Sequence, residues 1–170
     1  MTNRQHFTYN LAGILLRQQT PGPYACFDDH EGCDSTITVV CLKTETRLIS
    51  TYYWEEREGA LRCATAVAAA LNRAAGYTEF VDTLGDVRST SFNLKEFFRV
   101  YNEPFKARRA DCPYHGPYWE VVAGNKFVIH RVNWDSMRQT KLVAMAVAHA
   151  LSELRQSLQL ESDQVLAGEV

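Results

Sequence analysis

The sequence predicts an α+β fold, in which helices cover one face of a mainly antiparallel sheet. The main observation is a similarity between residues 37–74 and 117–154, which align without a gap and place Trp54 on Trp134. Each segment has two alternating runs joined by a polar turn, followed by an amphipathic helical pattern. We therefore predict an internal repeat of two β-hairpin-plus-helix units. Two ordinary hairpin-helix segments in one domain are the alternative, and they predict nearly the same fold.

Composition favours one globular domain over residues 1–170. The chain is 46% hydrophobic and 22% charged, which is enough apolar material for a substantial core. Its net charge of −2 argues against a protein that coats nucleic acid through its overall field. No apolar run approaches the roughly 20 residues that a membrane helix needs, and the first residues are too polar for a signal peptide. We expect a cytoplasmic protein that does not span a membrane.

Local signals place the elements of the first half. Apolar residues on one face predict a helix over 6–18, and the acidic segment 24–35 is expected to be a loop. The first hairpin runs over residues 36–54. The helix that follows is expected to end at Gly76, because glycine favours the left-handed conformation of a helix C-cap.

In the second half, a capping box formed by Asn93 and Glu96 predicts a short helix over 94–101. A basic loop, 106–109, then leads to the second hairpin, which is expected to turn at Gly124-Asn125. The final helix opens after another capping box and is expected to fray past about Leu160.

The final helix carries a second apolar stripe opposite its core stripe. Leu142, Met145 and His149 form this stripe, about half a turn from the core residues. A helix with two such stripes is expected to bury both faces, either beneath another helix of the chain or in a homodimer interface. We expect His149 to be peripheral rather than catalytic. The aligned residues of the first long helix are expected to be solvated surface: Arg62, Thr65 and Ala69.

Five cysteines in a chain without an export signal favour free thiols or metal ligands over disulfides. Cys112 and His115 have the spacing of one ligand pair of a tetrahedral zinc site. Cys26 and Cys33, which lie beside another histidine, are further apart than the usual pair. A structural zinc held by these four residues is therefore one alternative, and free thiols are the other.

Two other groups of residues suggest binding. Lys106, Arg108 and Arg109 lie close together in the predicted basic loop, near aromatic residues that nucleic-acid bases could stack on. Arg131 lies on the return strand of the second hairpin, where alternation can place it on an open sheet face. A solvated loop and simple surface exposure are the plainer interpretations.

Enzymatic motifs are missing from the sequence. It contains no phosphate-binding glycine loop, no HExxH zinc motif and no GxSxG elbow, so no catalytic residue is assigned. The leading hypothesis is a small non-enzymatic binding or regulatory protein that acts on a macromolecular partner and self-associates through its last helix. The alternatives are nucleic-acid binding through residues 106–109 and a Cys/His-dependent or zinc-dependent enzyme.

Overall fold

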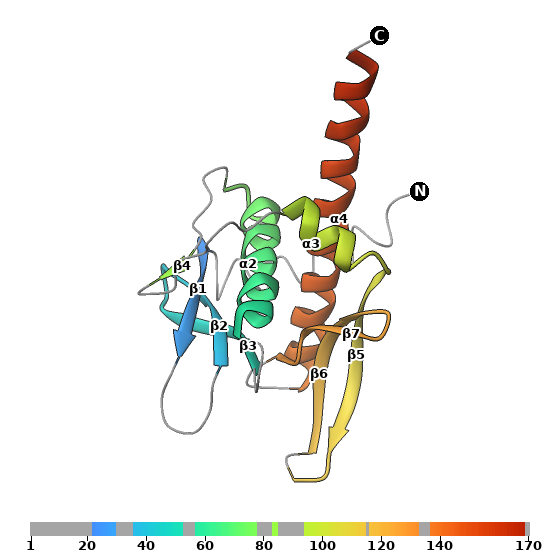
Figure 1. Cartoon of the computed structure of the whole chain (residues 1–170). Helices are drawn as coiled ribbons and strands as arrows, with labels where there is room; N and C mark the ends of the chain where they lie inside the picture. Colours follow the sequence, from blue (N-terminus) through green and yellow to red (C-terminus); the bar gives the residue numbers. More distant parts are fainter. Residues whose placement is uncertain are drawn as a thin grey trace.

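A computed structural model of the chain describes residues 22–29, 36–52, 57–77, 83–84, 94–114, 116–132 and 137–168. Two β-sheets are each packed against one long helix, and the fold is α+β as predicted (Figure 1). The described elements, in chain order, are β1 (Tyr24–Asp29), β2 (Thr36–Cys41), β3 (Thr46–Tyr52), α2 (Arg57–Ala74), β4 (Thr83–Leu84), α3 (Leu94–Val100), β5 (Phe105–Cys112), β6 (Gly116–Ala123), β7 (Lys126–Ile129), β8 (Arg131–Val132) and α4 (Met137–Gly168).

The first sheet has the strand order β4-β1-β2-β3-β8. Strands β1, β2 and β3 form an antiparallel meander, while β4 joins the outer edge of β1 in parallel. The expected loop over 24–35 is therefore wrong in its first part, because Tyr24–Asp29 is a strand. Tyr24, Ala25 and Cys26 are all buried. A strand that is buried on both faces lacks the alternation by which strands are usually recognised.

Helix α2 is buried on nearly all sides because it packs against the first sheet and also against α4 and β7. The prediction that Thr65 and Ala69 are solvated is wrong, while Arg62 is exposed as expected. The Thr65 hydroxyl donates a hydrogen bond to the carbonyl oxygen of Leu61 at 2.7 Å, which satisfies it inside the core. The small alanine side chains of α2 allow close approach on several faces.

The C-terminus of α2 confirms the predicted glycine cap. Gly76 has φ of +87°, and its N–H donates to the carbonyl of Arg73 at 3.1 Å. The N–H of Tyr77 donates to the carbonyl of Asn72 at 2.9 Å, which completes a Schellman motif. The Asn72 side chain also bonds the backbone of Tyr24 twice, accepting from its N–H at 2.7 Å and donating to its C=O at 2.9 Å. These bonds tie the end of α2 to the start of β1.

The second sheet is the antiparallel meander β5-β6-β7. The turn between β6 and β7 occurs at Gly124-Asn125, as predicted, with Gly124 at φ of +62°. The prediction that 106–109 is a loop is wrong, because these residues belong to β5. Charged side chains are common on edge strands, where they oppose unwanted pairing, and they obscured the strand pattern here.

The single sheet expected from the sequence is divided into two. Residues 126–132 contribute to both, since β7 pairs with β6 in the second sheet and β8 pairs with β3 in the first. Only His130 separates these two strands. Helices α2 and α4 begin at Arg57 and Met137, which the alignment of Trp54 with Trp134 also superimposes. The internal repeat nevertheless stays a prediction.

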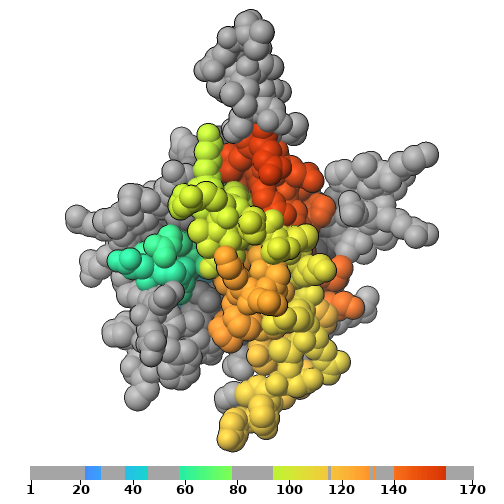
Figure 2. Space-filling view, turned by 45° about the vertical axis from the view of Figure 1, so that its right-hand side comes forward, coloured from blue at the N-terminus to red at the C-terminus, as the bar shows by residue number. Residues whose placement is uncertain are grey.

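Helix α4 packs over β5 and β6 and alongside α2, and one continuous apolar core includes residues of both sheets and all three described helices. The helix continues past Leu160 to Gly168, so its helical span is longer than expected, and its C-terminal part projects away from both sheets (Figure 1). Figure 2 shows α3 and α4 above the β5–β6 hairpin, whose tip protrudes at the bottom. Among the described helices, none is long and apolar enough to cross a membrane.

Candidate functional site: a groove between β5 and α4

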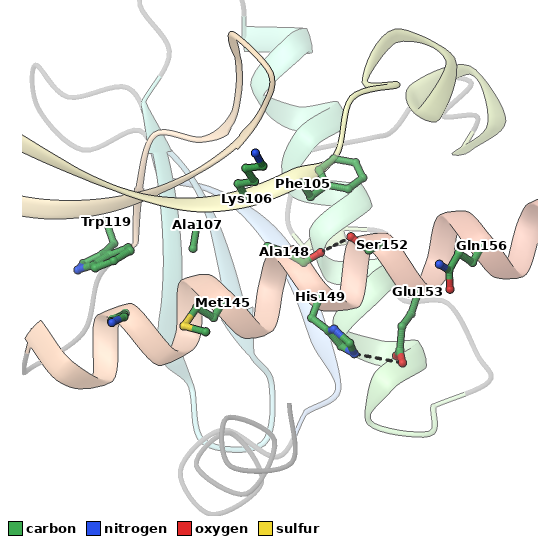
Figure 3. A pocket seen from close by; sticks show the side chains of 11 residues that line it. Phe105, Lys106, Ala107, Trp119, Met145, Ala148, His149, Ser152, Glu153 and Gln156 are labelled. Atoms are coloured by element: carbon green, nitrogen blue, oxygen red, sulfur yellow. Dashed lines mark hydrogen bonds and ion pairs between the residues drawn. The ribbon is translucent and has the colours of Figure 1, made fainter. Parts of the chain in front are cut away.

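An open cavity of about 710 Å³ lies between the edge of the second sheet and one side of α4 (Figure 3). Its helix side consists of residues three or four positions apart, which share one face of α4. The lining residues are Phe105, Lys106 and Ala107 of β5, Trp119 of β6, and Lys141, Met145, Ala148, His149, Ser152, Glu153 and Gln156 of α4. We call this cavity the β5–α4 groove.

The structure brings together three of the residues singled out from the sequence. Lys106, Met145 and His149 all line the β5–α4 groove. Leu142 is half-buried and packs against the core instead. The predicted second stripe of α4 therefore borders a cavity over part of its length.

The apolar part of the groove comes from both sheet strands and the helix. Trp119 and Ala107 point from the sheet toward α4, where Met145 faces them (Figure 3). Arg109 lies directly opposite Trp119 in the β5–β6 register, and cross-strand partners share one face of a sheet. Arg109 is therefore on the groove side of β5. Lys106 lies at the strand edge with its side chain directed away from α4 (Figure 3).

Cationic side chains surround this apolar floor. The Lys141 ammonium lies 5.6 Å from the Trp119 ring centroid, and Arg155 places its guanidinium 4.6 Å from the ring of Phe105. Arg155 also donates to the carbonyl of Glu103 at 2.9 Å, which fixes it beside Phe105. Burial lowers the pKa of Arg155 from its usual value, but the group stays charged at neutral pH.

The lining residues that the structure describes include one carboxylate, Glu153. Its Oε1 lies 3.2 Å from Nε2 of His149, a contact that gains charge attraction when the imidazole is protonated. Lys106 and Arg109 are both exposed, and neither forms an ion pair within the described residues. The groove is thus locally positive on a chain whose net charge is −2.

Arg108 points elsewhere and is already used within the fold. Its Nε donates to Oε1 of Glu120 at 2.7 Å, and the Glu120 side chain is only 2% exposed. Arg108 also lies over the ring of Phe127, which stacks on His130 at 4.4 Å. Its charge therefore compensates a buried carboxylate instead of facing the groove. Arg131 is in β8, opposite Ser50, and its side chain lies outside the described residues.

The predicted zinc ligands are only partly described. Cys26 is fully buried in the first sheet, where its Sγ donates to the Thr65 hydroxyl at 3.8 Å. Cys112 is half-buried at the end of β5 in the other sheet, whereas Cys33 and His115 lie outside the described residues. Within the part of the chain that the structure describes, no group of three or more His, Cys, Asp or Glu side chains is placed to hold a metal ion.

Sequence reasoning missed Lys141 as a groove residue and considered Trp119 only as one of the aromatic residues near the basic segment. Lys141 lies one turn before Met145, so extending the α4 stripe to polar residues would have included it. The position of Trp119 in the groove has no local signal, because it depends on how the sheet packs against the helix. No family model, curated protein or solved structure matches this chain. The groove is therefore the main basis for a functional proposal.

Proposed function

We propose that the chain is a small, non-enzymatic, cytoplasmic binding protein that captures a protein partner in the β5–α4 groove. The observation that carries this proposal is an apolar floor, formed by Phe105, Trp119 and Met145, beneath a rim of cations. Tryptophan, methionine and arginine are enriched at protein interfaces, where buried aromatic anchors supply most of the affinity.

The lining favours binding over catalysis. The Ser152 hydroxyl donates to the carbonyl of Ala148 at 2.9 Å within the same helix turn. His149 and Glu153 contact one another across adjacent turns on the α4 side of the groove. An indole, a thioether and ammonium groups dominate the remaining surface, and these groups anchor a partner without activating a nucleophile.

A peptide display library tests the proposal directly. Random peptides of about twelve residues are selected on the full chain, and their affinities are then measured by fluorescence anisotropy. Met145→Asp, which places a carboxylate on the groove floor, is expected to weaken the selected peptides at least about tenfold, or about 1.4 kcal/mol.

Val100→Asp is the matched control, because Val100 is 42% exposed on α3 and does not line the groove. It is expected to leave affinity within about twofold of the unmodified chain. Circular dichroism confirms that both variants fold. If no peptide is selected, or if both variants bind equally well, the proposal is wrong.

Self-association is a second proposed use of the same helix stripe. Leu142, Met145 and His149 are all partly exposed, which supports a homodimer through α4. Sedimentation velocity over a range of concentrations tests it: Met145→Asp should shift a dimer toward monomer. A chain that is monomeric at every concentration would remove this use of α4.

Nucleic-acid binding through residues 106–109 is the weaker alternative, because Arg108 is engaged with Glu120. It requires a labelled oligonucleotide to bind with an affinity that falls steeply with salt. No binding at low salt would exclude it. The zinc-dependent alternative, with Cys26, Cys33, Cys112 and His115 as ligands, is tested by native mass spectrometry of protein purified without chelator. A bound zinc ion would favour it.

The internal repeat belongs with these proposals. The alignment that places Trp54 on Trp134 also matches the helix starts at Arg57 and Met137, and both meanders carry a bulge between their second and third strands. Both coincidences support a repeat.

A further inference from the structure

The outer edges of β1 and β5 differ in what lies beside them. Both strands open an antiparallel meander that is packed against a long helix. In the first sheet, β4 pairs with the outer edge of β1, at Cys26 and Phe27. Within the described part of the chain, β5 pairs with β6 alone. The edge of β1 is therefore extended by a further strand of the same chain, whereas no described strand extends the edge of β5.

The pairing registers of the two meanders relate these edges position by position. Each meander has a bulge between its second and third strands, at Val39/Val40 and at Val121/Val122, and matching these bulges places Cys26 on Ala107 and Phe27 on Arg108. Ala107 lines the groove. The place that β4 occupies on β1 therefore corresponds to the mouth of the β5–α4 groove. The edge of β1 pairs with a short additional strand. The edge of β5 offers the same kind of backbone N–H and C=O groups, which can pair with an added strand there.

The two positions differ strongly in charge. Lys106 lies next to this place on β5, and Lys141 aligns with the buried Leu61 of the first unit. Arg109 adds another cation on the groove side of β5. An apolar segment of the chain itself suits the first edge, whereas the second edge matches a segment that carries carboxylates.

A second copy of β5 fits this edge poorly. The strand carries three cations, at Lys106, Arg108 and Arg109, against one acid at Asp111. Two such strands side by side would bring an excess of like charge together, which destabilises cross-strand pairing. A foreign acidic strand has no such conflict.

We infer that the occupant of the β5–α4 groove is an extended acidic segment of a partner protein, which pairs through its backbone with the edge of β5 that no other described strand occupies. This inference rests on the proposed function and specifies the class of ligand. Alternate side chains of the added strand point toward Trp119 and Met145, and carboxylates on that face meet Arg109 and Lys141, while a carboxylate on its other face meets Lys106.

The library-selected peptides are the probe for this inference. Their sequences are expected to be rich in Asp and Glu. Each peptide is then synthesised in two forms, with N-methyl groups on its odd-numbered or on its even-numbered amides. Because only alternate amides of an added strand face its neighbour, one form should lose at least about tenfold in affinity while the other binds nearly normally.

Charge reversal supplies the protein side of the experiment. The double variant Lys106→Glu with Arg109→Glu is expected to weaken acidic peptides at least about tenfold, whereas Lys43→Glu, in the exposed turn after β2, should change affinity less than about twofold. Circular dichroism again verifies folding.

The outcomes separate the two proposals. Three results with peptides that depend on Met145 would overturn the acidic strand and leave the groove as a binding site. The peptides are basic, they bind equally well in both N-methyl forms, or they lose affinity in both N-methyl forms, as a helix would. Peptides that do not depend on Met145, or the absence of any selected peptide, would overturn both.

Discussion

Asn72 offers a direct test of how α2 is fixed to the first sheet. Its side chain is 2% exposed and makes two hydrogen bonds with the backbone of Tyr24, which is also 2% exposed. Asn72→Ala deprives the N–H and C=O of Tyr24 of both bonds. Each buried group that loses its partner costs about 1–3 kcal/mol, so we expect the unfolding free energy to fall by about 3 kcal/mol. For a domain of this size, that loss lowers the melting temperature by about 6–12 °C.

Asn72→Asp sharpens the test because it keeps the shape and replaces the donor with an oxygen. A carboxylate held against the Tyr24 carbonyl in a buried site has its pKa raised above the value of about 3.9 in the unfolded chain. The folded variant therefore binds this proton more tightly than the unfolded chain does. Its stability increases as the pH falls through the raised pKa, since the protonated acid can again donate to Tyr24.

Urea denaturation followed by circular dichroism measures both variants at about pH 8 and about pH 5. We expect Asn72→Asp to be less stable than Asn72→Ala at the higher pH. At the lower pH, its unfolding free energy should rise relative to that of Asn72→Ala. Subtracting the unfolding free energy of Asn72→Ala at each pH removes the pH dependence that comes from the rest of the chain. The reasoning would be refuted if Asn72→Asp were as stable as the unmodified chain at the higher pH. It would also be refuted if the difference in unfolding free energy between Asn72→Asp and Asn72→Ala were the same at both pH values.

Three further expectations concern local features of the fold. Arg108→Ala leaves Glu120 buried without its cation and should cost about 1–3 kcal/mol of unfolding free energy by urea denaturation, while a further Glu120→Gln change should recover part of it. Gly76→Ala should cost about 1–2 kcal/mol in the same assay, because φ is +87° and no neighbouring atom lies within 4 Å of a built Cβ, so backbone strain alone acts. Burial raises the pKa of the Cys63 thiol to about 11, so iodoacetamide at about pH 8 should alkylate half-buried Cys112 and spare Cys63 in the folded protein, as peptide mass spectrometry would reveal. Equal alkylation of the two thiols would contradict the burial of Cys63.

Elements with local signals could be predicted from the sequence. The glycine cap at Gly76 and the turn at Gly124-Asn125 depend on backbone conformations that few residues adopt, so their positions are encoded locally. Helix α3 was also predicted within one residue of its observed end, and its Phe97 and Phe98 are buried. These features need little information from the rest of the chain.

Elements defined by distant partners were not predictable in the same way. Strand β1 is buried on both faces and β5 is charged, so neither shows the alternation of a half-exposed strand. The division into two sheets depends on the pairing of β3 with β8, which lies in the other half of the chain.

The candidate site shows the same limit. Helical periodicity is a local property, so the sequence could place Met145 and His149 on one face of α4, and both line the groove. Trp119 and Lys106 join them only through the packing of the second sheet on α4. The distance from Cys26 to any other proposed zinc ligand is likewise a tertiary property, and sequence spacing alone could not show that Cys26 is a core residue.

The passage of residues 126–132 from one sheet to the other affects how the chain folds during synthesis. Because β8 completes the first sheet beside β3, the edge of β3 stays open until the ribosome has made residue 132 and released it from the exit tunnel. An open edge can pair with another nascent chain, so the chain is exposed to misassembly during this interval. Completion of the first sheet therefore requires the second half of the chain, and a fragment that ends before β8 should need the remaining fragment in trans to become native.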